Sequence, residues 1–272
     1  MRIAISNIAW DVSEDEQISE LLSKYQVDAI DIAPGKYFPD PAKATDQDIA
    51  KVKAYWAEKG IEITGMQSLL FGTQGLNVFG SKQSQQAMLD HLNEVALIAK
   101  GLGAKRLVFG SPKNRDREGL TDEQTLIIAK DFFTKLGNIA DEYGVIFCLE
   151  PNPTCYGANF MTTAEETFEA VSAINHPAIK MQLDTGAITI NQERMPDVLA
   201  YSLNQIGHFH ISEPGLAVVG DSNADHDAYA SAIKARLNNV LVTIEMVATQ
   251  DEPHLTSIER ALAFVTQTYR AA

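Results

Sequence analysis

The chain has 272 residues, of which 45% are hydrophobic, so it can bury a large core without disulfides or a structural metal. It carries 22 Lys and Arg residues against 36 Asp and Glu residues, a formal net charge of −14. Nucleic acids and anionic membranes bind through basic surfaces, so this charge argues against both as partners. No apolar stretch is long enough for a signal peptide or a membrane-spanning helix, and we expect a cytoplasmic protein.

Apolar runs bounded by turn residues predict eight β-strands, and each strand is followed by a predicted helix. The strands are expected at residues 2–6, 28–33, 61–67, 105–111, 145–150, 179–184, 206–211 and 240–245. The helices are expected at residues 13–25, 45–59, 84–102, 121–143, 162–175, 192–203, 225–237 and 254–270. Ser13 with Glu16, and Thr121 with Gln124, fit capping boxes at two helix starts. The long loop at 68–81 is of the kind that often carries function.

Strict alternation of strands and helices predicts a parallel sheet, and eight such units in fewer than 300 residues predict a (β/α)8 TIM barrel. We expect one α/β domain that spans residues 1–272. The alternative is an open, doubly wound sheet. That fold usually has a glycine-rich phosphate loop after its first strand, and residues 7–10 contain no glycine.

The fifth predicted strand is apolar from Val145 to Leu149 and runs directly into Glu150, which two prolines follow closely. A carboxylate at the end of a buried strand is costly unless a partner compensates its charge. That partner could be structural, or it could be a metal or a substrate. Cys148 in the same strand is expected to be a buried free thiol, which suits a reducing compartment. It forms no zinc-type cluster with Cys155.

The last four predicted strands each end in a side chain that can bind a metal: Glu150, Asp184, His210 and Glu245. In a barrel these ends converge on the face that carries the active site. Three carboxylates and one imidazole suit one divalent cation, with Mn²⁺, Mg²⁺ or Co²⁺ preferred and Zn²⁺ as a further option. The alternative is that each carboxylate is ion-paired or solvated and that the histidine is a core residue.

Two further polar residues share a strand face with these candidates. Residues two apart in a strand are separated by about 6.6 Å, so His208 should lie one layer deeper than His210 and should not bind the same metal. We expect it to pack in the core or to support the ligands. Gln182 lies deeper than Asp184, where it could orient a ligand by a hydrogen bond or be a hydrogen-bonded core amide.

Polar side chains near the predicted strand ends are candidates for substrate binding: Asn7, Gln67, Lys113, Arg115, Glu213 and His226. Lys113 and Arg115 could neutralise a phosphate or carboxylate, or they could be solvated loop charges. Glu213 could accept a hydrogen bond from a sugar hydroxyl or cap a turn. His226 follows Asp225, which could itself be only a helix cap.

Five short motifs resemble the xylose-isomerase-like barrel superfamily, within its group of sugar phosphate isomerases and epimerases. They are Leu-Glu-Pro-Asn at 149–152, Gln-Leu-Asp-Thr-Gly at 182–186, His-Phe-His-Ile-Ser-Glu at 208–213, Thr-Ile-Glu-Met at 243–246 and Gly-Ser-Pro at 110–112. The resemblance extends through the strand order over nearly the whole chain. It implies that Glu150, Asp184, His210 and Glu245 bind one divalent metal, as in ketose 3-epimerases, and that Glu150 and Glu245 act as catalytic acid and base.

This resemblance implies a metal-dependent sugar isomerase or epimerase. The enzyme would remove a proton next to a carbonyl, pass through an enediolate, and act on a small ketose, sugar phosphate or keto-polyol. The chain departs from the ketohexose pattern at three positions. Ala187 replaces a substrate-binding histidine, Leu216 replaces an arginine, and Tyr156 replaces an acidic residue. The metal and acid/base set is therefore retained, while the substrate set differs.

Three alternatives remain open at this point. A dehydratase of a keto-polyol would begin with the same proton abstraction. A DNA-repair endonuclease shares the barrel, but it uses many histidines and the chain has only six. A non-catalytic sugar-binding barrel would explain the replaced substrate contacts, although Glu150 and Glu245 argue for catalysis. A carbohydrate is the expected small-molecule partner, and the sequence is compatible with a homo-oligomer.

Overall fold

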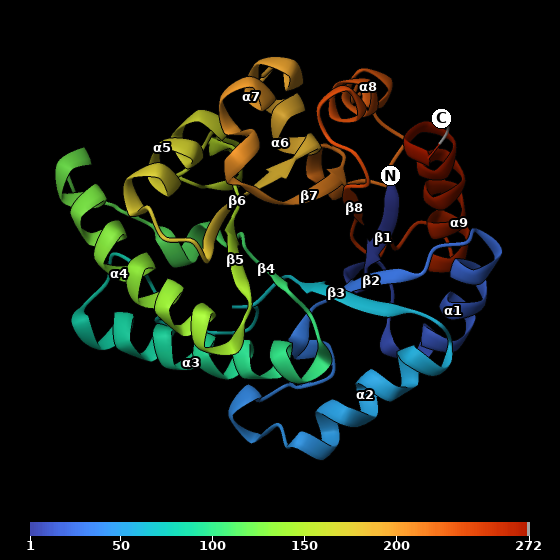
Figure 1. The fold of residues 1–272 in the computed structure, drawn as a ribbon, viewed down its shortest axis with the longest axis horizontal. Helices are drawn as coiled ribbons and strands as arrows, with labels where there is room; N and C mark the ends of the chain where they lie inside the picture. The colour runs from blue at the N-terminus through green and yellow to red at the C-terminus, as the bar shows by residue number, and fades with distance from the viewer. Residues whose placement is uncertain (271–272) are drawn as a thin grey trace.

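The structure is a computed structural model that describes residues 1–270. Within these residues, eight parallel strands close into a barrel in the order β1 to β8, and the helices surround it (Figure 1). The strands are β1 (Arg2–Ser6), β2 (Ala29–Ile32), β3 (Glu62–Met66), β4 (Arg106–Phe109), β5 (Ile146–Leu149), β6 (Ile179–Asp184), β7 (Ile206–Ser212) and β8 (Leu241–Glu245). The α-helices are α1 (Asp15–Lys24), α2 (Asp46–Glu58), α3 (Lys82–Leu102), α4 (Asp122–Tyr143), α5 (Ala164–Ile174), α6 (Thr185–Ile190), α7 (Met195–Ser202), α8 (His226–Arg236) and α9 (His254–Val265).

The first and last strands close the barrel by pairing with each other. Strand β1 pairs with β2 on one side and with β8 on the other, so that Ile5 lies opposite both Ile30 and Ile244. The strands are rich in branched apolar residues because both of their faces are covered, and all four residues of β2 are buried. The predicted (β/α)8 barrel is confirmed.

Most helix ends follow the local signals in the sequence. The hydroxyl of Thr121 accepts a hydrogen bond from the backbone N–H of Gln124 at the start of α4. Gly103 and Gly144 end α3 and α4 with φ angles of 90° and 66°, which glycine adopts without strain. The predicted capping box of Ser13 and Glu16 is wrong. The N–H of Asp11 donates to the Glu14 carboxylate instead, and α1 begins at Asp15, two residues later than expected.

Two helical segments differ from the prediction. The short helix α6 follows β6 directly, because the Asp184 carboxylate accepts a hydrogen bond from the N–H of Ala187 and so caps it. At the C-terminal end, the expected helix at 254–270 divides into α9 and a π-helical turn (Thr266–Arg270).

The two cysteines lie in different environments. Cys148 in β5 is fully buried, and burial raises the pKa of its thiol to about 12. Cys155 is exposed, and both thiols are free. The prediction that Cys148 is a buried free thiol is therefore confirmed. None of the helices described for residues 1–270 combines the length and apolar character needed to span a membrane.

Candidate metal centre and active site

Four side chains meet at the carboxyl ends of the last four strands. Glu150 directly follows β5, Asp184 ends β6, His210 lies in β7 and Glu245 ends β8. All four are buried, and one ligand atom from each lies within 4.8 Å of the others. Parallel strands of a barrel present their carboxyl ends at one face, so residues far apart in sequence converge there. The cluster consists of the four residues predicted as metal ligands.

His210 lies between the two glutamates. Its Nδ1 atom is 3.2 Å from Glu150 Oε1 and 3.2 Å from Glu245 Oε2. Burial opposes the charged imidazolium, but the glutamate charges and hydrogen bonds raise the pKa of His210 well above its ordinary value. Burial likewise opposes ionisation of Glu245, but the charge of His210 and hydrogen bonds from His210 and Gln67 lower its pKa. With no cation bound, a protonated His210 therefore supplies the positive charge that the glutamates require.

The pKa of the third carboxylate, Asp184, is shifted in the opposite direction to that of Glu245. Burial and the neighbouring charges of Glu245 and Glu150 raise the pKa of Asp184 to about 7. The site thus holds more negative charge than His210 alone can compensate. A divalent cation would relieve this repulsion, and four donor atoms within 4.8 Å of one another match the space around one such ion. The donor set therefore fits one hard or borderline divalent cation.

Neighbouring donors fix the orientation of each carboxylate. Gln67 Nε2 donates to Glu245 Oε1 at 2.6 Å, and Asn152 Nδ2 lies 3.3 Å from Glu150 Oε2. Asp184 accepts from Ser212 Oγ at 2.6 Å, in addition to the backbone N–H that it caps. These contacts keep the oxygens aimed at a common point, as is typical of supported metal sites.

Gly110, which follows β4, allows Glu150 to take its position. A Cβ atom at residue 110 would lie 1.8 Å from Glu150 Oε2 and 2.9 Å from its Cδ. Non-bonded heavy atoms do not approach this closely, so any side chain at position 110 would displace the Glu150 carboxylate. The glycine in the Gly-Ser-Pro motif is thus required by the carboxylate of Glu150, the residue that follows β5.

Replacing Gly110 with alanine is expected to weaken divalent-metal affinity by about tenfold or more, because disturbing the surroundings that orient a metal ligand typically costs about 10- to 100-fold. The Glu150 side chain can rotate away, so the protein should still fold. Calorimetric titration with Mn²⁺ measures the affinity, and thermal unfolding measures the integrity of the fold. Unchanged affinity in the variant would show that Glu150 is not a ligand in this geometry.

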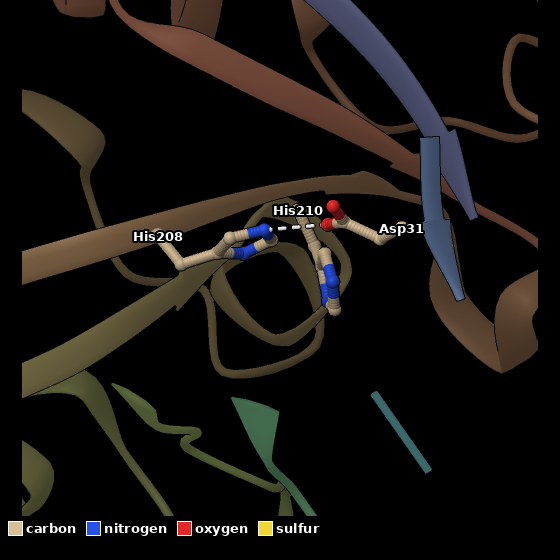
Figure 2. Close-up of side chains that lie close together, drawn as sticks. All are labelled: Asp31, His208 and His210. Atoms are coloured by element: carbon tan, nitrogen blue, oxygen red, sulfur yellow. Dashed lines mark hydrogen bonds and ion pairs between the residues drawn. The ribbon is translucent and has the colours of Figure 1, made fainter. Parts of the chain in front are cut away.

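A second polar layer lies beneath the cluster, within the barrel. His208 Nε2 donates to Asp31 Oδ2 at 2.7 Å, and this bond links β7 to β2 across the interior (Figure 2). Thr64 and Thr243 donate to the two oxygens of Asp31 at 2.8 and 2.9 Å. Burial opposes the charge on Asp31, but His208 and the hydroxyl of Thr64 lower the pKa of Asp31, whereas burial lowers the pKa of His208. A neutral imidazole thus donates to an ionised carboxylate.

This layer confirms that His208 lies deeper than His210 and supplies a residue that the sequence analysis missed. Asp31 is a carboxylate inside a buried apolar strand, the same signal that identified Glu150, but it does not stand at the strand end. The expectation that Gln182 makes a hydrogen bond is wrong. Its side-chain oxygen and nitrogen are buried, and neither has a hydrogen-bond partner among residues 1–270.

A cavity of about 750 Å³ opens above the carboxylates. Its size lies within the range of pockets that bind small molecules. Three of the six predicted substrate-binding residues line this cavity, namely Gln67, Lys113 and Glu213, and the other three do not. Their roles in substrate binding stay predictions.

The remaining three candidates are buried away from the cavity. Asn7 accepts a hydrogen bond from the N–H of Ala33 at 2.7 Å. Arg115 is fully buried, its nitrogens have no hydrogen-bond partner in the described chain, and burial lowers its pKa to about 10. His226 donates or accepts at both ring nitrogens, towards Tyr269 and Glu213. None of these side chains is placed to contact a molecule in the cavity directly.

Glu213 and His226 form a buried pair at 3.1 Å. Glu213 also accepts hydrogen bonds from the backbone N–H groups of Gly220 and Ala224. Burial opposes its ionisation, but the hydrogen bonds from His226 and Gly220 lower the pKa of Glu213 below its ordinary value of 4.5. The pair therefore ties the loop after β7 to the start of α8.

The variant Glu213→Gln is expected to lower the free energy of unfolding at neutral pH by about 3 kcal/mol, the scale for breaking a buried pair. A carboxylate with a lowered folded-state pKa contributes stability above its unfolded pKa, and this contribution is lost as the pH falls through the folded pKa. The difference from wild type should therefore shrink as the pH falls below the ordinary glutamate pKa of 4.5 and through the lowered pKa of Glu213. Urea unfolding at several pH values measures it, with the exposed Glu169→Gln as control. A difference that does not vary with pH would show that the ionised carboxylate of Glu213 does not stabilise the fold.

Comparison with known proteins identifies the family to which this fold belongs. The fold and its strand-end cluster are those of a TIM barrel with a candidate metal site. The family model described as "Xylose isomerase-like TIM barrel" matches residues 19–268, and the chain belongs to that family.

Solved structures with the same fold include several sugar epimerases. A D-psicose 3-epimerase from Clostridium cellulolyticum H10, determined with D-tagatose, is 19% identical, with a TM-score of 0.82 over 99% of both chains. An L-ribulose 3-epimerase is 18% identical, with a TM-score of 0.83 over 99% of this chain and 94% of that one. The IolI protein, determined with a bound zinc atom, is 18% identical, with a TM-score of 0.76 over 99% of this chain and 98% of that one. At these identities the similarity establishes the shared fold.

Proposed function

We propose that the protein is a divalent-metal-dependent sugar isomerase or epimerase that removes a proton next to a carbonyl group. The observation that carries this proposal is the pair of buried glutamates, Glu150 and Glu245, held on either side of His210 beneath a small-molecule cavity. Two carboxylates in such a position can act on opposite faces of one substrate carbon. The substrate class is a small ketose, sugar phosphate or keto-polyol, and the epimerases among the structural neighbours support it.

The glutamates supply the proton transfers. One removes the proton next to the carbonyl, and the other returns a proton from the opposite face, which inverts the carbon. The lowered pKa of Glu245 keeps it ionised and able to act as a base. Its Oε1 accepts from Gln67, so Oε2 is the oxygen directed into the site. Asn152 orients Glu150 in a comparable way.

Glu150, Asp184, His210 and Glu245 would hold the cation, which we propose to be Mn²⁺, Mg²⁺ or Co²⁺, with Zn²⁺ as a further option. When bound, it would stabilise the negative charge that develops on the substrate oxygens. The zinc atom bound in the structure of the IolI protein, which has the same fold, supports the presence of a metal. Ser212 and Gln67 keep two of the carboxylates in place for this role.

The test is solvent deuterium exchange. The purified protein, loaded with Mn²⁺, is incubated in D₂O with a panel of ketoses, ketose phosphates, keto-polyols and keto-glycosides, and proton NMR follows the carbons next to the carbonyl. We expect deuterium incorporation together with a second epimer or the isomeric aldose. Loss of water after exchange would instead identify a dehydratase. Absence of exchange with every compound, in a protein that binds the metal, would contradict the proposed function.

A further inference from the structure

Five apolar side chains lie among the residues that line the cavity. They are Ile8, Phe71, Tyr156, Leu216 and Val247, which we call the apolar rim. Three of these side chains are exposed large hydrophobic residues, with Phe71 at 85%, Val247 at 44% and Tyr156 at 43%. Exposed apolar side chains that gather around a cavity usually mark a binding surface. The rim continues directly into the wall above Glu150 and Glu245.

Hydrogen bonds between loops hold one side of the apolar rim in place. The Tyr156 hydroxyl accepts from the N–H of Gly215 at 2.6 Å, which joins the loop after β5 to the loop after β7. The N–H of Val247 donates to the carbonyl of Leu216 at 3.2 Å, and the N–H of Ala248 donates to Ile8 at 3.1 Å. The Tyr156 ring is thereby fixed by its polar end, and its apolar face remains available. A preorganised surface of this kind binds a ligand at a lower entropic cost.

The cavity offers few cations that could recognise a phosphate. Among the described residues that line the cavity, the cations are Lys36 and Lys113. Lys36 donates to the backbone carbonyls of Asn7 and Trp10, and Lys113 lies exposed near the carbonyl of Thr73.

Barrel enzymes often bind phosphate in the loops after strands 7 and 8 and at a nearby helix N-terminus. Here the N–H groups of Gly220 and Ala224 donate to Glu213, and the N–H of Ala228 at the start of α8 donates to Asp225. These carboxylates occupy the amides and would repel a phosphate. Among the described residues that line the cavity, a phosphorylated substrate would therefore find the exposed Lys113 as its one available cation, with no free amides beside it at the loops after β7 and the start of α8.

From these observations we infer that the substrate is an unphosphorylated keto sugar that carries an aryl or alkyl group, as in a glycoside with a ketone in its ring, and that the apolar rim binds this group. The inference rests on the proposed function, because it places the reacting carbons over Glu150 and Glu245. A volume of about 750 Å³ exceeds what a free monosaccharide fills. Ala187 and Leu216, which also line the cavity, offer no hydrogen bond to the outer hydroxyls of a free sugar. The same apolar wall suits an aglycone.

The test measures binding without turnover. Phenyl and methyl glycosides of D-glucose, D-galactose and D-allose lack the ketone, so calorimetry on the metal-loaded protein reports ground-state affinity alone. We expect at least one phenyl glycoside to bind about tenfold or more tightly than its methyl counterpart, because the ring buries apolar surface. Phe71→Ala and Val247→Ala should reduce this preference to about twofold or less. Both residues are exposed, so the core remains intact, and Ile127→Ala, which removes an exposed apolar side chain from α4, should leave the preference unchanged.

Three results would overturn the inference. They are equal or undetectable binding of the phenyl and methyl glycosides, tighter binding of D-glucose 6-phosphate than of the phenyl glycosides, and a wild-type dimer that Phe71→Ala dissociates. The last would identify the rim as an interface between two copies of the chain. A phenyl preference in a protein that fails the deuterium-exchange test would instead retain the subsite and contradict the proposed chemistry. The two hypotheses therefore fail separately.

Discussion

Replacing Glu150 or Glu245 with glutamine is expected to reduce the rate of deuterium exchange by roughly 10²–10⁴-fold, the contribution usually made by a positioned acid or base. Glutamine keeps the size of the side chain but removes the negative charge that accepts the proton. Both residues also belong to the proposed metal site, so each variant is compared at a saturating Mn²⁺ concentration. Proton NMR in D₂O, with the substrate identified from the panel, measures the rate. The exposed Glu142→Gln variant is the control and should exchange at the wild-type rate.

The two variants should also differ from each other. If the glutamates serve opposite faces, each single variant retains a base on one face only. Glu150→Gln and Glu245→Gln should then exchange the proton of different epimers. Identical residual exchange from both epimers in both variants would contradict the two-base arrangement. Full activity in either variant would exclude that glutamate as a catalytic residue.

Divalent-metal affinity is expected to fall steeply as the pH drops below neutrality. Asp184 has a pKa of about 7, and the pKa of His210 is raised well above its ordinary value, so both carry protons in the cation-free protein at lower pH. A metal must displace these protons, and each proton released weakens binding by about tenfold per pH unit below the group's pKa. The affinity for Mn²⁺ should therefore fall by up to about 100-fold per unit below pH 7. Calorimetric titrations in two buffers of different ionisation enthalpy measure both the affinity and the number of protons released.

Thermal unfolding gives an independent check. In the cation-free protein, the stability of the fold should fall as the pH rises, whereas the metal affinity should increase. A histidine with a raised folded-state pKa stabilises the fold below its unfolded pKa, and this contribution is lost as the pH rises through the folded value. A carboxyl with a raised pKa likewise disfavours the folded state once it ionises. With EDTA, these two groups should make the protein less stable at about pH 8 than at about pH 6, whereas Mn²⁺ should stabilise it more at the higher pH. An Mn²⁺-induced shift that does not change with pH would contradict the proposed ligand set.

The sequence predicted the architecture well because a barrel strand is buried on both faces and reads as an apolar run. It predicted the site because the ligand candidates stand where such runs end. Asp184, at the end of β6, also caps α6. The sequence pattern indicated Asp184 as a metal ligand, and it did not also predict that a helix begins there. Asp31 escaped notice because its partner, His208, is 177 residues away in the chain. No local pattern reports a contact across the barrel interior.

Loop residues were the least predictable. Lys113 and Arg115 are two residues apart in the same loop, yet one lies exposed at the cavity and the other is completely buried. A charged residue in a predicted loop normally implies exposure, and only the packing of neighbouring loops decides otherwise. The same holds for His226, which pairs with Glu213 rather than facing the cavity. Substrate specificity depends on these loops, which is why the sequence indicates the reaction more readily than the sugar.

The contrast between the two cysteines has a practical consequence. Cys148 is sealed in β5 with a thiol pKa of about 12, so it should resist maleimides, whereas the exposed Cys155 should react. Cys155 is adjacent in sequence to Tyr156 at the mouth of the cavity. The unmodified chain therefore offers one addressable attachment point beside the entrance. A fluorophore or spin label placed there could report ligand entry in real time without any engineered mutation.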